Sequence, residues 1–248
     1  MHKSVYILAI LFSAIHKPAS VTAQVNGKQP VLYWAETLVQ HITPGNTSYR
    51  HKNTVVVWPP GSNNDDTGFQ SHADCSGLIN ALLRQAYQFN DVLMKSWLGA
   101  SRPLASHYFN AVCNEQHFKK ITNIQELQPG DLLVIKYADR SDHEDNTGHC
   151  MLVAAKPILL AGIGAQAPHM FQYEVMVIDA SKSPHGRTDT RYVEKSMGYG
   201  GTGKGLFRLY ADANGLLKGY SWSTLKPRQG FDPFQNPIVA GRFDFRER

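Results

Sequence analysis

A cysteine, a histidine and an aspartate lie in short patterned segments of this chain, and these side chains cooperate in nucleophilic amide chemistry. Cys75 lies in the run DCSGL, His149 in GHCMLV and Asp179 in VIDAS. In such sites a thiolate attacks a carbonyl carbon, an imidazole carries the proton, and a polar group orients the imidazole. The sequence therefore predicts a thiol-dependent hydrolase, provided that the fold brings the three side chains together.

The segment around the cysteine predicts a helix that begins at Cys75, with Asp74 as a favourable N-cap. Apolar residues recur at intervals of three and four, at Cys75, Ile79, Leu82, Ala86 and Phe89. This spacing is typical of one buried helix face. A thiol at a helix start feels the positive end of the helix dipole, which favours the thiolate. The alternative for Cys75 is a small buried apolar residue without chemistry.

Two strand-like runs follow the helix. In residues 147–155 the alternation places His149 on the face toward the helix and Cys150 on the opposite face. In residues 173–181 it places Asp179 on one face with Tyr173 and other alternate residues. If the two strands are neighbours, Asp179 can hold the imidazole of His149 in place.

Four motifs occur in a fixed order, namely DCSGL at 74–78, LQPGDLLVI at 127–135, GHCMLV at 148–153 and VIDAS at 177–181. Together they resemble the NlpC-type cell-wall cysteine peptidases, a papain-like family. The resemblance implies an α+β fold with the nucleophile helix packed on an antiparallel sheet. By position it implies Cys75 as nucleophile and His149 as base. Asp179 matches the third polar residue, which in that family is most often a histidine, and His185 is its rival.

The same resemblance implies a substrate and its binding residues. The substrate would be the stem peptides of peptidoglycan, cut next to D-glutamate and a diamino acid. Asp74 and Ser76 would bind the free amino end of the peptide, and the chemistry needs no metal or cofactor. The residues by themselves indicate only a thiol amidohydrolase. A transglutaminase-like acyltransferase, which uses Cys, His and Asp in this order, and a non-catalytic wall-binding module remain alternatives.

The N-terminus predicts export. A basic start, an apolar run from Val5 to Ile15 and the small-residue segment Val21-Thr22-Ala23 are typical of a signal peptide over residues 1–23. The expected location is periplasmic or secreted, and no later run is long and apolar enough to predict a membrane span. Residues 24–248 are then predicted to form one papain-like domain with an N-terminal helical extension at 29–42.

Net charge and cysteine content bear on two further points, nucleic-acid binding and free thiols. The chain has 25 Lys and Arg against 20 Asp and Glu, and loss of residues 1–23 would leave a net charge of +3. This excess is too small to predict nucleic-acid binding. An odd number of cysteines leaves at least one free thiol, which we expect to be Cys75. Cys113 and Cys150 are expected to be thiols, with a disulfide between them as the alternative.

The remaining strand-like runs predict a sheet of about six strands, at residues 132–137, 148–153, 173–181, 206–211, 217–222 and 237–243. Residues 54–58 predict a further short strand, residues 62–73 a loop, and residues 90–126 mostly helical and irregular structure. The acidic segment 138–148 has no metal-ligand spacing, so we expect a solvated loop.

The run GYGGTGKG at 198–205 resembles a phosphate-binding loop. However, Gly205 follows Lys204 where such loops carry the Ser or Thr that binds magnesium. No clear strand precedes the run either. We therefore expect a flexible loop, which could cover the substrate groove.

Overall fold

The computed structural model describes residues 27–59, 68–138, 146–160, 169–194, 196, 198–222 and 236–246. The predicted signal peptide and most of the acidic segment lie outside the described residues. The helices are α1 (Pro30–His41), α2 (Cys75–Tyr87), α3 (Asp91–Leu98) and α4 (Ala105–Cys113). The strands are β1 (Thr47–Tyr49), β2 (Val55–Val57), β3 (Gln70–Ala73), β4 (Phe118–Ile121), β5 (Leu132–Lys136), β6 (Gly148–Val153), β7 (Ile158–Leu159), β8 (Phe171–Ser181), β9 (Gly201–Ala211), β10 (Leu217–Ser221) and β11 (Ile238–Phe243).

The main sheet confirms the predicted α+β class, with eight strands where about six were expected. Its order is β10-β9-β8-β6-β5-β11-β4, with β7 paired to β8, and every pairing is antiparallel. All six predicted strands lie in it. The additional strands are β4, which has the sequence FKKI, and the two-residue β7, whose side chains are exposed. Neither is long enough to show a clear alternation of apolar and polar residues.

The sheet curls until its two ends meet. The Leu217 N–H at the start of β10 donates to the carbonyl of Thr122, just after β4, and Ile124 N–H donates to Gly215. The face turned inward encloses one apolar cluster, which includes Met151, and the outer face contributes to a second cluster shared with the helices. Curvature and the helices therefore bury both faces of the central strands β5 and β6, as their apolar sequences require.

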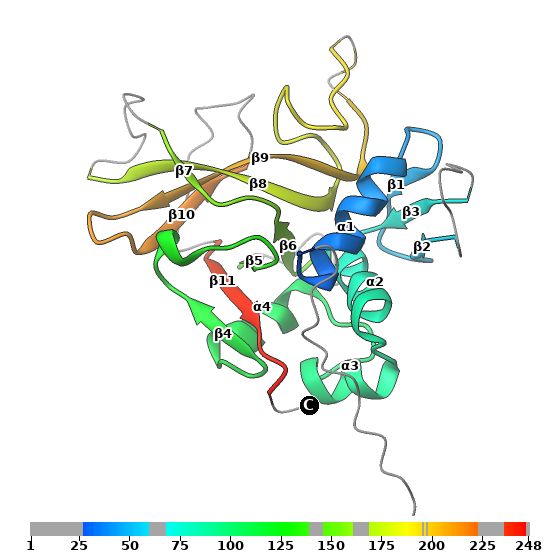
Figure 1. Ribbon diagram of the computed structural model, residues 1–248, viewed down its shortest axis with the longest axis horizontal. Helices are drawn as coiled ribbons and strands as arrows, with labels where there is room; N and C mark the ends of the chain where they lie inside the picture. The colour runs from blue at the N-terminus through cyan, green and yellow to red at the C-terminus, as the bar shows by residue number, and fades with distance from the viewer. Residues whose placement is uncertain are drawn as a thin grey trace, which may run out of the picture.

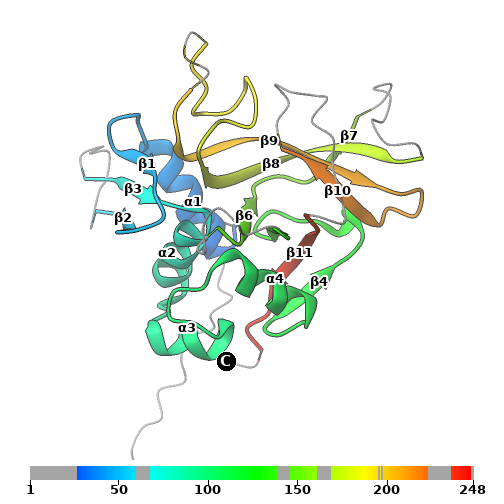
Figure 2. The ribbon, with the colours of Figure 1, turned by 180° about the vertical axis from the view of Figure 1, so that it is seen from behind.

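The helices cover the outer face. Figure 1 shows α2 beside β6 with α1 next to α2, and Figure 2 shows α4 lying across β5 and β11. The predicted helix at 29–42 is confirmed as α1, which packs on α2. Within α2 the side chains of Leu78, Ile79 and Leu82 are fully buried, each contributing about 1.5–3 kcal/mol of transfer free energy. Within the described residues no helix has the length and apolar character needed to cross a membrane.

A small three-stranded sheet, ordered β1-β3-β2, leads the chain into α2. The predicted strand at 54–58 is confirmed as β2. The prediction of a loop at 62–73 is wrong at its end, because residues 70–73 form β3. Its sequence QSHA is polar, but Ser71 is buried and hydrogen-bonds Thr202 at 2.6 Å. Because its buried side chains include polar ones, the sequence shows no apolar alternation that would predict this strand. β3 ends directly before Asp74 and Cys75 and so positions both residues.

The prediction of a flexible glycine-rich loop at 198–205 is also wrong. Residues 201–205 form the first half of β9. They pair with β8, from Gly201 opposite Ser181 to Gly205 opposite Val177. Glycine normally weakens a strand and often marks a place where other groups approach closely. Here, the groups that approach are the side chains of Asp189 and Arg191.

Candidate active site

Cys75 is the first residue of α2 and lies against the start of β6. Its side chain is buried, and its sulfur lies 3.7 Å from the carbonyl oxygen of Gly148. Gly148 has a φ of 150°, and a Cβ there would run into the backbone carbonyl of Ile135. Only glycine fits this position. The glycine of the GHCMLV motif thus lets β6 start directly beneath the sulfur.

His149 and Asp179 meet as the sequence predicted. Strands β6 and β8 are antiparallel neighbours, and His149 Nε2 lies 2.6 Å from Asp179 Oδ2. Both side chains are buried. The contact with Asp179 occupies Nε2, so Nδ1 is the ring nitrogen that remains for the hydrogen bond between His149 and Cys75. The three predicted residues therefore form one connected chain from sulfur to carboxylate.

The predicted facing of β6 is wrong. Cys150 and Leu152 belong to the cluster shared with α2, whereas Met151 belongs to the inner cluster. His149 nevertheless reaches Cys75, because the helix start lies at the end of the strand, over Gly148. Cys150, expected to point away from the helix, instead hydrogen-bonds the Cys75 sulfur. All three cysteines are thiols, as expected.

Electrostatics favour a thiolate on Cys75 and an imidazolium on His149. The hydrogen bond from Cys150, together with the charge of His149, outweighs burial and lowers the pKa of Cys75 to about 5. Burial would lower the pKa of His149, but the Cys75 charge and the Asp179 hydrogen bond raise it to about 9. Between these values the proton resides on the imidazole and the sulfur is charged. This is the state that a cysteine nucleophile requires.

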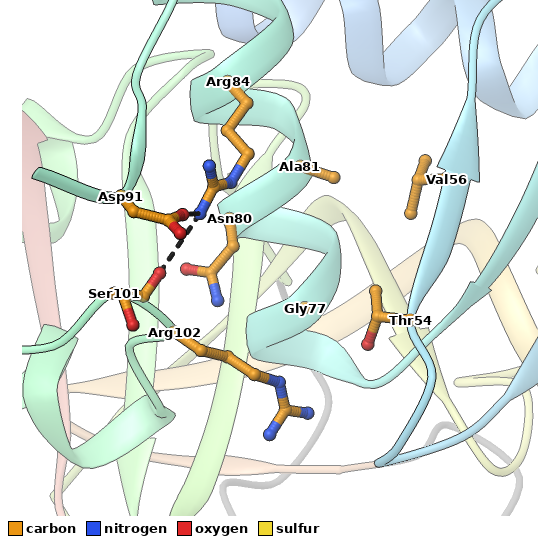
Figure 3. Close-up of a pocket in the computed structure, with 9 residues that line it drawn as sticks. All are labelled: Thr54, Val56, Gly77, Asn80, Ala81, Arg84, Asp91, Ser101 and Arg102. Atoms are coloured by element: carbon orange, nitrogen blue, oxygen red, sulfur yellow. Dashed lines mark hydrogen bonds and ion pairs between the residues drawn. The ribbon is translucent and has the colours of Figure 1, made fainter. Parts of the chain in front are cut away.

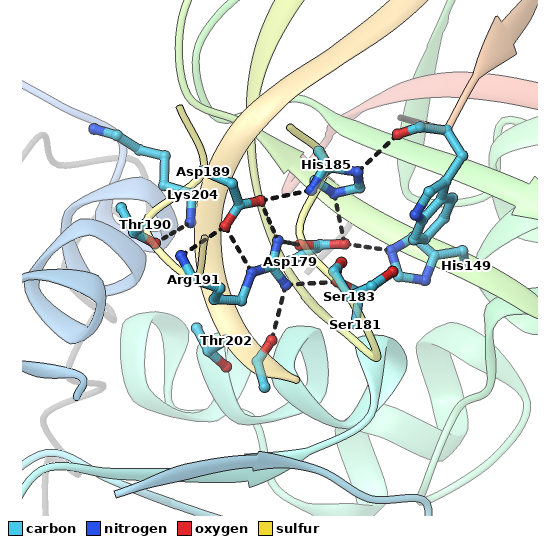
Figure 4. Close-up of polar contacts among 12 residues, drawn as sticks. His149, Asp179, Ser181, Ser183, His185, Asp189, Thr190, Arg191, Thr202 and Lys204 are labelled. Atoms are coloured by element: carbon cyan, nitrogen blue, oxygen red, sulfur yellow. Dashed lines mark hydrogen bonds and ion pairs between the residues drawn. The ribbon is translucent and has the colours of Figure 1, made fainter. Parts of the chain in front are cut away.

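Asp179 is fully buried and is held by three groups (Figure 4). Its Oδ2 accepts from His149 and lies 3.0 Å from His185 Nε2, and its Oδ1 accepts from Arg191 at 2.9 Å. Burial alone would raise the pKa of Asp179. The charges of His185 and Arg191 and the hydrogen bonds from both histidines hold that pKa well below its usual range. The Asp179 carboxylate is therefore ionised over the pH range in which Cys75 is a thiolate and His149 an imidazolium.

Asp179 and His185, the two candidates for the third polar residue, contact each other in the structure. Asp179 contacts the His149 imidazole directly, and His185 contacts Asp179 as well. Sequence reasoning missed Arg191, because RTDTRY at 187–192 reads as a polar loop, although its Arg191 and Asp189 are buried. It also missed the part played by Cys150.

Asp74 has the predicted N-cap role, since its Oδ1 accepts from the Gly77 N–H at 2.6 Å. Ser76 also donates to Oδ1, and both side chains are buried. The other oxygen of Asp74 accepts from the half-exposed Arg102 at 3.1 Å and lies 3.3 Å from His51 Nδ1. A cation of the chain itself therefore balances the carboxylate beside the thiolate.

A cavity of about 230 Å³ opens beside His149. Its lining is mostly polar and aromatic: Tyr49, His51, Tyr137, Asn146, Gly148, His149, Ser181, Lys182, Ser183 and Trp222. Trp222 packs edge-on against the His149 ring, with centroids 4.5 Å apart. Burial and the nearby Cys75 raise the pKa of both Tyr49 and Tyr137, so these phenols stay protonated. The cavity thus presents hydroxyl donors and an aromatic wall next to His149.

A second cavity, of about 360 Å³, lies along α2. Figure 3 shows Gly77 and Thr54 next to each other in its lining, and Arg84 bound to Asp91 and to the carbonyl of Ser101. Arg102 lines this cavity and also binds Asp74. A polar depression therefore runs along α2 from Gly77 to Arg84, and Arg102 connects it to the carboxylate of Asp74, the residue before Cys75.

Comparison with known proteins places the chain beside a viral protein. No family model matches the sequence, and no solved structure matches it. Among curated proteins, it is 37% identical over 220 residues to "Uncharacterized protein R653" of Acanthamoeba polyphaga mimivirus. The match covers 86% of this chain and 96% of the viral protein. At this identity and coverage, the chain belongs to the same protein family as that mimivirus protein.

Proposed function

We propose that this protein is a cysteine hydrolase that cleaves amide bonds in peptides. The observation that carries the proposal is the buried contact series from the Cys75 sulfur through His149 to Asp179. A cysteine that is only structural needs neither an imidazole nor an oriented carboxylate beside it. Perturbed pKa values of opposite direction in two touching groups, next to a cavity, are typical of a functional site.

The geometry supports a two-step reaction. The Cys75 thiolate attacks the carbonyl carbon of the substrate, and His149, already protonated, gives its proton to the leaving amine. His149 then takes a proton from water, which attacks the thioester and regenerates the thiolate. Asp179 accepts a hydrogen bond from Nε2 throughout, so that Nδ1 stays directed at the sulfur.

A donor for the developing oxyanion lies at the helix start. Among the described residues, no group accepts a hydrogen bond from the backbone N–H of Cys75. The first N–H groups of a helix have no partner within the helix, and a donor directed at a developing negative charge lowers the barrier. We therefore assign this N–H to the oxyanion. The protonated phenol of Tyr49 lines the adjacent cavity and is a second candidate.

We propose peptidoglycan stem peptides as substrate, with a D-glutamyl–diamino acid bond as the bond cut. The support is the four-motif resemblance to NlpC-type peptidases, which also favours a papain-like domain over residues 24–248 and an exported protein. A substrate amino group bound by Asp74 and Ser76 would have to share the Asp74 carboxylate with Arg102. In this proposal Arg102 therefore moves or pairs with a substrate carboxylate when the peptide binds.

The test is mass spectrometry of purified muropeptides after incubation with the protein. We expect products that carry one added water, formed by wild type and absent with Cys75→Ser. Added glycine ethyl ester separates hydrolysis from acyl transfer. Products in which the amine has replaced water would favour the acyltransferase alternative. If the muropeptides stay unchanged although Cys75 still reacts with iodoacetamide, the proposed substrate is wrong.

A further inference from the structure

The segment after β8 folds back and buries an arginine against the sheet. Arg191 is fully buried, and its Nε and Nη2 donate to the two oxygens of Asp189 at 2.9 and 2.7 Å. Nη2 also donates to Asp179, and Nη1 donates to Ser181 and to the carbonyl of Gly201. The guanidinium is therefore fixed on all sides (Figure 4). Such forked contacts set direction as well as charge.

The glycine-rich start of β9 makes room for this pair. A Cβ on Gly203 would lie 2.6 Å from Cδ of Arg191 and closer still to its Nε. A Cβ on Gly205 would collide with the carboxylate of Asp189. Neither glycine has a positive φ, so their backbone conformation suits any residue. Their small size, not backbone freedom, is what the structure uses.

His185 approaches Asp179 from another direction. Its Nε2 lies 3.0 Å from Asp179 Oδ2, and its Nδ1 lies 3.0 Å from the carbonyl oxygen of Trp222. Both contacts are to hydrogen-bond acceptors, since Asp179 is ionised. His185 therefore lies between two hydrogen-bond acceptors, the Asp179 carboxylate and the Trp222 carbonyl. Its backbone N–H donates to Asp189, which joins His185 to the Arg191 pair.

We propose that Arg191 and His185 are positioning residues, which lock Asp179 so that His149 keeps its proton directed at Cys75. The role rests on the proposed thiol chemistry at this site, whatever the substrate. The charged and titratable groups that face Asp179 are His149 from β6 and His185 and Arg191 from the returning segment, with Asp189 behind Arg191. The glycine-rich run is then the space required for this lock and not a phosphate-binding loop.

The decisive variant is Gly203→Ala, which removes no polar group from the site. The added methyl group must push the Arg191 side chain, so Asp179 Oδ1 loses its donor and the carboxylate turns away from His149. The matched control is Gly45→Ala, at an exposed position where the nearest atom to the new Cβ is 3.9 Å away. Arg191→Lys is the second variant, because it keeps the charge but cannot reproduce the fork.

The readout is the pH dependence of Cys75 alkylation by iodoacetamide, followed by peptide mapping. The groups that face the sulfur are Asp74, His149, Cys150, Tyr49 and Tyr137. A poorly oriented imidazolium stabilises the thiolate less, so the acid limb should move up by about one pH unit in Gly203→Ala and Arg191→Lys. Gly45→Ala should match wild type. At pH well above the limb, all four proteins should react at similar rates.

A purely structural role predicts a different result. Gly203→Ala and Arg191→Lys would then unfold at lower temperature while their acid limbs coincide with wild type, and this outcome would overturn the proposal. The readout does not depend on any substrate. If the limb moves but wild type leaves muropeptides uncut, the proposed substrate fails and the positioning role stands.

Discussion

The thiol of Cys150 gives the most quantitative prediction. Cys150 is fully buried, and its hydrogen bond is the largest single influence that lowers the pKa of Cys75. Cys150→Ala removes the donor and little else, because Ala remains apolar and differs by one sulfur atom. The small cavity should cost about 1 kcal/mol of stability, which a folded domain tolerates.

The magnitude follows from the strength of that bond. A hydrogen bond to a charged group contributes about 1.5–3 kcal/mol, and one pH unit corresponds to about 1.4 kcal/mol. A thiol is a weak donor, so we take the lower end, about one pH unit. The acid limb of Cys75 alkylation should therefore move from about 5 to roughly 6, and the rate at pH 5 should fall about five-fold.

The assay is alkylation by iodoacetamide from pH 4 to 9, quantified on the peptide that contains Cys75. Cys113→Ala is the matched control, because Cys113 is an exposed thiol at the end of α4. Its limb should coincide with wild type. If Cys150→Ala keeps the wild-type limb as well, the Cys150 hydrogen bond does not stabilise the thiolate, and the electrostatic account of the site is wrong.

Three further predictions concern the same site. Cys75→Ser and His149→Ala should each abolish hydrolysis, and the double variant should be little worse, since the two residues act as a unit; additive losses in kcat would contradict this. Hydrolysis should decline as pH falls through about 5, where the thiolate is protonated, and as pH rises through about 9, where the imidazolium is lost; a pH–rate profile checks both limbs. Asp74→Asn keeps the cap and should leave the melting temperature nearly unchanged, because Arg102 is half-exposed and its ion pair contributes little; kcat/KM should fall more for peptides with a free amino end than for acetylated ones.

Much of the site could be predicted because its signals are local. The N-cap and the apolar spacing fix the start of α2 at Cys75. The alternation in the two strands places His149 beside Asp179 once the strands pair. Each inference needs only a few neighbouring residues and the period of the element they form. The same holds for α1 and for the six strands that were expected.

The errors arise where distant segments decide the structure. Alternation shows that His149 and Cys150 face opposite ways, but not which face meets the helix, since both faces of the curled sheet are buried. The glycine-rich run reads as a loop because the reason for its glycines, the Arg191 and Asp189 pair, lies on another segment. Ionic partners buried by the fold cannot be identified from spacing alone.

The central claim is that the Cys75 sulfur forms a covalent bond with the substrate. It is tested most directly by mixing the protein with muropeptides, quenching with acid at short times, and measuring the intact mass and the modified peptide. The account predicts a transient acyl group on Cys75, present in wild type, longer-lived at low pH and absent in Cys75→Ser. Hydrolysis that proceeds with no adduct on Cys75, or that persists in Cys75→Ser, would contradict it.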